Sequence, residues 1–103
     1  MYLIFDTETT GLPKKWNAPI SVSENWPRCV QLAWQLHDNN GKLISHQSSI
    51  IKPDGFDIPF ESEKVHGIST VLANEIGENL NNVLEKFNSD LFKAKYIVGH
   101  NLK

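Results

Sequence analysis

Alternating apolar and polar positions are the clearest pattern in the central part of the sequence. From Val30 to Leu36 every second residue is apolar, with polar or small residues between. A period of two predicts a β-strand with one apolar face. The turn residues Asn39-Asn40-Gly41 follow, and Leu43 to Ile51 then predicts a second strand of weaker alternation. We therefore expect an antiparallel hairpin in this region.

Two short apolar runs lie near the ends of the sequence. Tyr2 to Phe5 and Tyr96 to Val98 are rich in aromatic and β-branched residues, and each predicts a buried strand. Residues 14–28 lack periodicity and contain several Pro, Ser and Asn, which predicts a long surface loop. We expect Trp16 and Trp26 to hold this loop against the body of the protein, in preference to contacting a partner.

The pattern changes to that of helices after Pro59. Ser62 to His66 predicts a short helix that ends at Gly67. Spacings of three and four then predict one amphipathic helix from Ile76 to Leu91. Its apolar positions are Ile76, Leu80, Leu84, Phe87 and Leu91. The order of strand, loop, hairpin, helices and strand predicts an α/β fold.

Composition restricts the class of protein. A chain of 103 residues, with 40% hydrophobic and 21% charged residues, has the size and composition of one globular domain. The net charge of −2 excludes a protein that holds nucleic acid by a broad basic surface, so any such contact should be local. No apolar run approaches the roughly 20 residues that cross a bilayer, and no signal peptide is recognisable. We expect a cytoplasmic protein without a membrane partner.

The single cysteine, Cys29, cannot form a disulfide within the chain. It stands directly before the alternating run that begins at Val30. A small, buried apolar role is therefore a better interpretation than a nucleophile.

Asp6 and Glu8 stand two residues apart where the first apolar run ends. If the strand stays extended through Glu8, both side chains lie on one face, with α-carbons roughly 6–7 Å apart. Such hard oxygen ligands select Mg²⁺ or Mn²⁺. An Asp-x-Glu pair is common, and for the pair taken alone two exposed carboxylates at the end of a strand are the favoured interpretation. The apolar strand before the pair and Thr-Thr-Gly-Leu after it favour a functional site.

Several runs resemble those of one enzyme superfamily. Phe5-Asp-Thr-Glu-Thr-Thr-Gly-Leu12 resembles the first motif of the DnaQ-like (DEDD) 3′→5′ exonucleases. Val30-Gln-Leu-Ala-Trp34 resembles the second strand of that superfamily, and Ile51-Lys-Pro53 the end of its third. Val65-His-Gly-Ile68 resembles its segment near the substrate 3′ end, and Val98-Gly-His-Asn101 the start of its second motif. The Thr-Thr-Gly-Leu sequence favours the type of the proofreading (epsilon) subunit of bacterial DNA polymerase III.

This resemblance implies a ribonuclease H-like mixed sheet, with an antiparallel hairpin beside parallel strands. It also implies hydrolysis of nucleotides from single-stranded or frayed DNA 3′ ends, with two Mg²⁺ or Mn²⁺ ions in the complete domain. Asp6 and Glu8 would be the catalytic metal ligands. The residues that would contact the substrate are Thr9, Leu12, His66 and Asn101. A structural role at a helix end is the alternative for His66, and an N-cap role the alternative for Asn101.

The sequence also departs from the superfamily, which uses four carboxylates and a histidine base. No acidic residue follows Asp90, and the place of His100 matches a structural histidine. We therefore expect residues 1–103 to be the N-terminal portion of one exonuclease domain, with the sheet truncated after its fourth strand. Such a portion should be inactive alone, and its uncovered apolar face could pair with another chain.

Two other functions are open. The chain could be a non-catalytic module that docks on a polymerase subunit or on a nucleic-acid end. It could also be a phosphatase with Asp6 as nucleophile, although that chemistry prefers Asp-x-Asp, and Glu8 counts against it. DNA and RNA substrates are not distinguished, because discrimination depends on contacts with the 2′-hydroxyl group.

Overall fold

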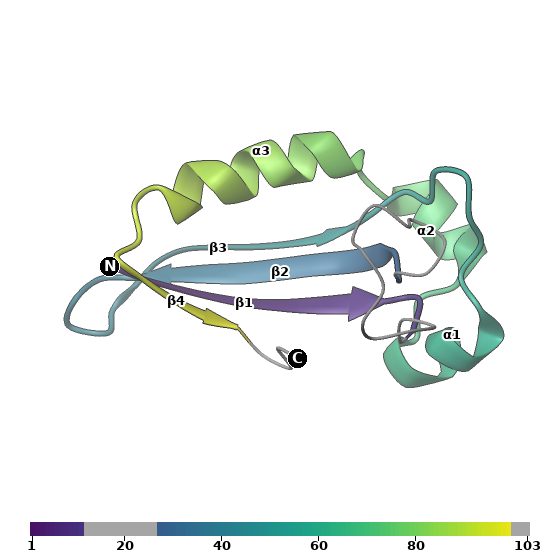
Figure 1. The fold of residues 1–103 in the computed structure, drawn as a ribbon, viewed down its shortest axis with the longest axis horizontal. Helices are drawn as coiled ribbons and strands as arrows, with labels where there is room; N and C mark the ends of the chain where they lie inside the picture. The colour runs from purple at the N-terminus through teal and green to yellow at the C-terminus, as the bar shows by residue number, and fades with distance from the viewer. Residues whose placement is uncertain (12–26, 100–103) are drawn as a thin grey trace, which may run out of the picture.

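The computed structural model describes residues 1–11 and 27–99, which form a four-stranded mixed sheet with helices (Figure 1). The elements are β1 (Tyr2–Thr9), β2 (Cys29–His37), β3 (Leu43–Ile50), α1 (Phe60–His66), α2 (Thr70–Ile76), α3 (Leu80–Leu91) and β4 (Tyr96–Gly99). The strand order is β3-β2-β1-β4; β1 and β3 are each antiparallel to β2, and β4 is parallel to β1. The expected α/β sheet, with a hairpin beside parallel strands, is confirmed.

The β2–β3 hairpin closes through a turn organised by Asp38. The Gly41 amide donates to the Asp38 carbonyl at 3.0 Å. The Asp38 carboxylate accepts from the amides of Asn40 and Lys42, each at 2.9 Å. Gly41 has φ of +82°, a conformation that glycine adopts without strain. The predicted antiparallel hairpin is therefore confirmed.

One face of the sheet packs against α3 (Figure 1). The core cluster there consists of Leu3, Leu32, Trp34, Leu36, Ile51 and Val83. The Phe87 ring packs edge-on against the rings of Phe5 and Trp34, with centroids 5.7 and 5.3 Å away. Aromatic pairs at these separations add to the burial that holds the helix on the sheet.

The expected single helix from Ile76 to Leu91 is wrong: two helices, α2 and α3, occupy this region. The chain leaves α2 at Gly77, and the next residue pairs with β3, because the Glu78 amide donates to the Ile50 carbonyl at 2.7 Å. The Asn79 side chain then accepts from the Asn81 amide and caps α3. Ile76 therefore ends α2, where its side chain is 58% exposed.

The short helix before Gly67 is confirmed, although α1 begins at Phe60, two residues earlier than expected. Gly67 ends it in the left-handed conformation, with φ of 75°. The loop expected at residues 14–28 lies mostly outside the described residues, as do Trp16 and Trp26; Pro27 and Arg28 belong to no regular element.

No described helix covers the face of the sheet opposite α3 (Figure 1). Ile4 is 41% exposed there and Val98 is 50% exposed. The rings of Tyr2 and Tyr96 stack on each other with centroids 5.1 Å apart. We call this surface the open face. Within residues 1–11 and 27–99, no helix is long and apolar enough to cross a membrane.

Candidate functional site

Asp6 and Glu8 lie on the open face of β1, which is a central strand between β2 and β4. Leu3 and Phe5 pack toward α3, so the alternation along the strand places Asp6 and Glu8 on the opposite side. The strand stays extended through both residues: Asp6 pairs with Ala33 and Glu8 with Gln31. Both carboxylate residues are half-buried. The expected same-face arrangement is therefore present.

The parallel strand β4 brings a second segment to the same place. Its pairing with β1 runs from Tyr2 opposite Tyr96 to Phe5 opposite Gly99. Strand β4 therefore ends one residue before Asp6 in register. In a sheet with parallel strands, the carboxyl ends are where ligands bind.

The chain just beyond Glu8 is fixed by hydrogen bonds. The register with β2 shifts between Glu8 and Thr9, which marks a bulge. The Thr10 amide donates to the Arg28 carbonyl at 3.0 Å, and the Arg28 amide donates to Thr10 Oγ1 at 2.9 Å. The Ser62 hydroxyl of α1 donates to the Thr10 carbonyl at 2.6 Å. The end of β1 is thus tied to both β2 and α1.

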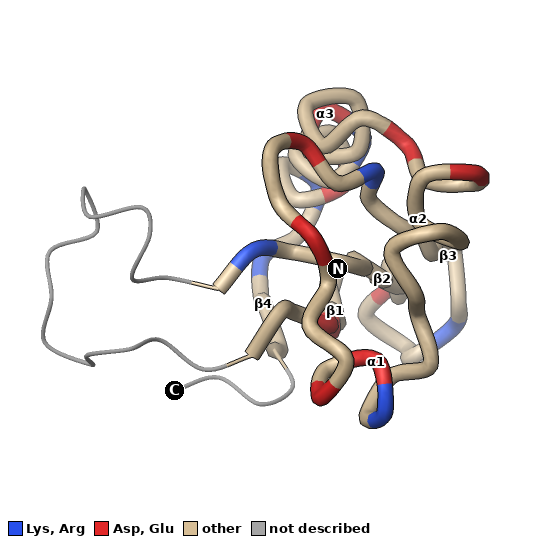
Figure 2. Tube along the Cα trace, turned by 90° about the vertical axis from the view of Figure 1, so that its right-hand side faces the viewer, with Lys and Arg blue, Asp and Glu red and all other residues tan. Residues whose placement is uncertain are grey.

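His66 lies at the end of α1, the helix that sits beside the end of β1 (Figure 2). Its Nδ1 accepts from the Ile68 amide at 3.0 Å, so in the neutral ring the proton lies on Nε2. That Nε2 is buried and has no hydrogen-bond partner among the described residues. The structural role weighed for His66 is therefore present at one nitrogen, and an unused donor remains at the other.

The other expected substrate contacts are placed only in part. Thr9 ends β1, and its hydroxyl donates to the Gly11 carbonyl at 3.0 Å. Leu12, His100 and Asn101 lie outside the described residues. The structure therefore brings Asp6, Glu8 and Thr9 together on one strand.

A divalent ion needs hard oxygen donors, and Asp6 and Glu8 supply two carboxylates of that kind. Residues 1–11 and 27–99 hold no cluster of three or more Asp, Glu, His or Cys side chains that could bind a metal ion. Mg²⁺ takes octahedral coordination and keeps several waters, so two protein ligands fit it incompletely. The donor set fits part of a divalent-ion site.

Within the described residues, no concentration of one charge sign distinguishes the candidate site. Acidic and basic residues are scattered over the described elements, and α1 carries both signs, with Glu61, Glu63 and Lys64 (Figure 2). This mixture agrees with the net charge of −2. Substrate affinity would depend on local contacts and bound ions, not on a basic surface.

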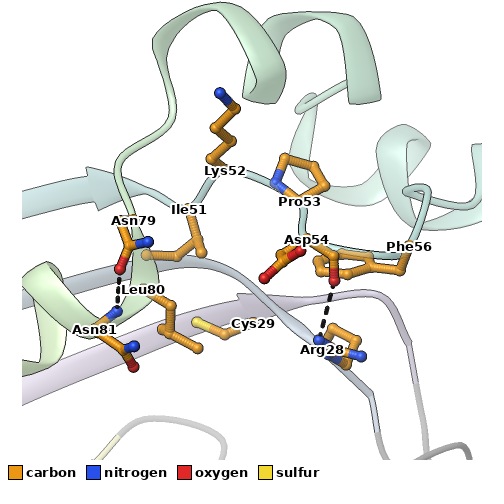
Figure 3. Close-up of a pocket in the computed structure, with 10 residues that line it drawn as sticks. All are labelled: Arg28, Cys29, Ile51, Lys52, Pro53, Asp54, Phe56, Asn79, Leu80 and Asn81. Carbon is orange, nitrogen blue, oxygen red and sulfur yellow. Dashed lines mark hydrogen bonds between the residues drawn. The ribbon is translucent and has the colours of Figure 1, made fainter.

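Among the described residues, α3 borders a polar and an apolar hollow, and Asp6 and Glu8 line neither of these. A polar hollow of about 280 Å³ lies where α3 begins, and Arg28 donates to the Asp54 carbonyl across it at 3.3 Å (Figure 3). It is lined by Arg28, Cys29, Ile51, Lys52, Pro53, Asp54, Phe56, Asn79, Leu80 and Asn81. An apolar hollow of about 460 Å³ lies between α3 and the sheet. It is lined by Phe5, Thr7, Cys29, Leu32, Leu80, Leu84, Phe87, Leu91 and Ile97.

Cys29 borders both hollows and is half-buried. Burial raises the pKa of its thiol, and a hydrogen bond to the Gln31 carbonyl only partly opposes this. A raised pKa keeps the sulfur protonated and unreactive. The interpretation of Cys29 as a small packing residue is supported.

Sequence patterns did not identify the hydrogen bonds that join Ser62, Thr10 and Arg28 just beyond the end of β1. The Ser62–Thr10 contact joins residues 52 positions apart. No local spacing predicts such a contact, because serine and threonine are also common in solvent-exposed helix starts and turns.

Comparison with known proteins identifies exonuclease I as a structural relative. No family model and no curated protein match the sequence. A solved structure of exonuclease I is 25% identical with a TM-score of 0.72, and the match covers 97% of this chain and 20% of that chain. E. coli exonuclease I in complex with a dA16 oligonucleotide gives 25% identity and a TM-score of 0.73, covering 97% and 20%. A product-bound structure of exonuclease I is 23% identical with a TM-score of 0.74, and the match covers 97% of this chain and 22% of that chain.

The chain thus spans about a fifth of the length of the exonuclease I chains that it matches. The likeness confirms the ribonuclease H-like fold and supports the DnaQ-like superfamily. These neighbours do not confirm the proofreading-subunit type.

Proposed function

We propose that this chain forms the N-terminal portion of a 3′→5′ exonuclease domain that acts on single-stranded DNA ends. One observation carries the proposal. Asp6 and Glu8 occupy the same open face at the end of a central strand, in a fold similar to exonuclease I. Neighbouring structures of E. coli exonuclease I are complexes with a dT13 or a dA16 oligonucleotide, which supports DNA as the substrate.

In this proposal Asp6 and Glu8 hold Mg²⁺ or Mn²⁺ through their carboxylates, and the two ions of a complete domain need further ligands. Two divalent ions bound there would supply an activated water and would stabilise the leaving oxygen. The positions of the Asp6 and Glu8 side chains would determine where the ions lie. Because β1 is paired on both sides through Phe5, the Asp6 backbone cannot shift easily, and the carboxylate is held in a defined place.

Thr9 and His66 are the proposed contacts with the terminal nucleotide among the described residues, and Leu12 and Asn101 are proposed by resemblance alone. Thr9 follows Glu8 directly, so its backbone lies beside the carboxylates. His66 has a fixed ring and an unused Nε2 donor, which suits an acceptor oxygen on a substrate. A buried donor without a partner is unfavourable until such an acceptor arrives.

Two carboxylates should bind ions weakly, so DNA binding is the more sensitive test of this chain. We expect a 5′-fluorescein-labelled linear single strand to bind more tightly with Mn²⁺ than without it, in fluorescence anisotropy. Asp6→Asn and Glu8→Gln should each weaken the Mn²⁺-dependent part by roughly 10- to 100-fold, the range seen when a metal site loses a supporting group. Glu85→Gln, which changes an exposed carboxylate of α3, is the matched control and should have no effect.

Circular single-stranded DNA of the same sequence has no 3′ end and should bind less tightly than the linear strand. Equal binding of both forms, or Mn²⁺ dependence that survives Asp6→Asn and Glu8→Gln, would contradict the proposal. Shortening of the labelled strand from its 3′ end would show that the chain is active by itself.

A non-catalytic module that docks on a polymerase or on a DNA end is the second candidate. It is favoured by the donor set within residues 1–11 and 27–99, where Asp6 and Glu8 form no larger cluster of metal ligands. The proofreading-subunit type belongs with the exonuclease proposal, and it would add a polymerase subunit as a partner there too. End-specific DNA binding that needs no divalent ion would support the docking module over the exonuclease.

A further inference from the structure

Helix α1 lies beside the end of β1 (Figure 2) but is weakly held by apolar packing. None of its residues is buried. Its anchors are the residues on either side, since Ile58 and Ile68 are buried in a cluster with Val30 and Ala73. A helix of seven residues has little stability of its own, so contacts with the rest of the protein must fix its position.

A hydrogen bond from Ser62 supplies such a contact. The Ser62 hydroxyl donates to the Thr10 carbonyl at 2.6 Å, a short distance for this type of bond. The acceptor is itself held in place, because Thr10 is bonded twice to Arg28, the residue just before β2. The bond therefore joins α1 to a fixed point and not to a loose loop.

The same helix face carries His66. Ser62 and His66 are four residues apart, so they lie above one another on one side of α1. Both are half-buried, whereas Phe60 and Val65, on the other faces, are 67% and 83% exposed. The position of the His66 ring relative to β1 is therefore coupled to the Ser62 bond.

Glu8 is connected to the Ser62–Thr10 hydrogen bond through the backbone between Glu8 and Thr10. Glu8 is the last residue of β1 in regular register, and the bulge between Glu8 and Thr9 separates it from Thr10. Bulges redirect the side chains beside them, so the direction of Glu8 depends on how Thr10 is fixed. Removing the Ser62 donor frees one of the constraints on that segment.

We propose that Ser62 is a positioning residue: through Thr10 it fixes the end of β1 that carries Glu8, and it holds His66 of α1 beside it. The proposal rests on the proposed function, since it gives the carboxylates and His66 one common site. Ser62 touches neither ion nor substrate.

Ser62→Thr and Ser62→Val form the test pair, because these two side chains have the same shape and differ in the hydroxyl group. Hydrogen exchange measured by NMR should be faster at the Thr10 and Gly67 amides in Ser62→Val. A roughly three- to tenfold increase corresponds to the loss of one hydrogen bond. Ser62→Thr should retain the slow exchange. The Gly77 amide of α2, bonded to the Ala73 carbonyl at 2.9 Å, is the internal control and should not change.

Mn²⁺ binding separates a positioning role from a purely structural one. Free Mn²⁺ measured by electron paramagnetic resonance should show weaker binding to Ser62→Val than to the unaltered chain, by a few-fold, with Ser62→Thr restored. Ser89→Ala, a change at an exposed serine of α3, should leave both measurements unchanged. A merely structural bond would alter exchange in α1 without altering Mn²⁺ binding, and that result would overturn the proposal.

Equal exchange in Ser62→Thr and Ser62→Val would also overturn it. Absence of Mn²⁺ binding by the unaltered chain would contradict the proposed function instead, and the exchange measurement would then decide whether Ser62 holds α1.

Discussion

Single polar side chains fix the described fold at places that apolar packing leaves undetermined. Trp34 is 3% exposed, and its indole nitrogen donates to Asp90 Oδ2 at 2.9 Å. This bond links β2 to the last turn of α3 and sets how the helix lies along the sheet. Ser45 approaches the same oxygen at 3.4 Å, too far for a strong bond.

Asp90→Ala should destabilise the chain by about 1–3 kcal/mol, because it leaves the buried Trp34 donor without a partner. Ser45→Ala is the control and should change stability by less than about 0.5 kcal/mol. Urea unfolding followed by tryptophan fluorescence measures both. Equal losses of stability in Asp90→Ala and Ser45→Ala would show that the bond between the Trp34 indole and Asp90 does not stabilise the fold.

The carboxyl group of Glu78 should make the free energy of unfolding depend on pH. Hydrogen bonds from Ser49 and then Lys86 lower the pKa of its carboxyl group. A lowered pKa in the folded state contributes stability above the usual pKa of a glutamate, and this contribution is lost as pH falls through the folded-state value. The free-energy difference between the unaltered chain and Glu78→Gln should therefore shrink on acidification.

The effect should be small, because the side chains of Lys86 and Glu78 are 50% and 42% exposed and the pair is screened by solvent. Urea unfolding across the acidic range measures it, with Glu85→Gln as the control. A difference that grows on acidification would show that the pKa of Glu78 is raised.

The sequence alone was sufficient to place residues whose arrangement follows from local periodicity. Asp6 and Glu8 could be placed on one face because the period of a strand is two. Ser62 could not be connected to them, because its acceptor is a backbone carbonyl 52 residues away. A backbone acceptor has no sequence signature, so only the folded chain reveals this contact.

At the scale of elements, strands were predictable and the helix boundary was not. Ile76 and Leu80 keep a helical spacing across the break, which made α2 and α3 resemble one helix. The break comes from Gly77, which lies against the backbone of the segment after β3. A Cβ built there would be 2.2 Å from the Ala73 carbonyl and 2.6 Å from the Lys52 amide.

Gly77→Ala should therefore destabilise the chain by about 3 kcal/mol, because backbone atoms cannot move aside. Gly55→Ala is a matched control: it meets nothing within 4 Å, and its φ of +77° alone should lead to a loss of about 1–2 kcal/mol. Thermal unfolding followed by circular dichroism measures both, at about 4–8 °C for each kcal/mol in a domain of this size. A smaller loss at Gly77 than at Gly55 would contradict the close approach.

On the scale of the whole molecule, the described chain is a sheet with α3 on one face and an open second face. The open face combines the carboxylates with the exposed apolar side chains of Tyr2, Ile4, Tyr96 and Val98. Exposed apolar surface of this kind favours association.

We expect the chain to form dimers as its concentration rises, in sedimentation velocity. Val98→Thr should shift the chain toward the monomer, because it replaces a methyl group on the open face with a hydroxyl. Val71→Thr makes the same change on α2, where Val71 is 67% exposed, and should have no effect. A similar shift for both variants would show that the open face is not the contact.

The central claim is that Asp6 and Glu8 together bind a divalent ion on the open face. Titration with Mn²⁺, followed by loss of amide signals in ¹H–¹⁵N NMR spectra, tests it most directly, since the ion broadens only nearby nuclei. Signals around Asp6 and Glu8 should disappear first, and Asp6→Asn or Glu8→Gln should each prevent the loss while Glu85→Gln does not. Broadening centred elsewhere, or unchanged in Asp6→Asn and Glu8→Gln, would contradict the claim.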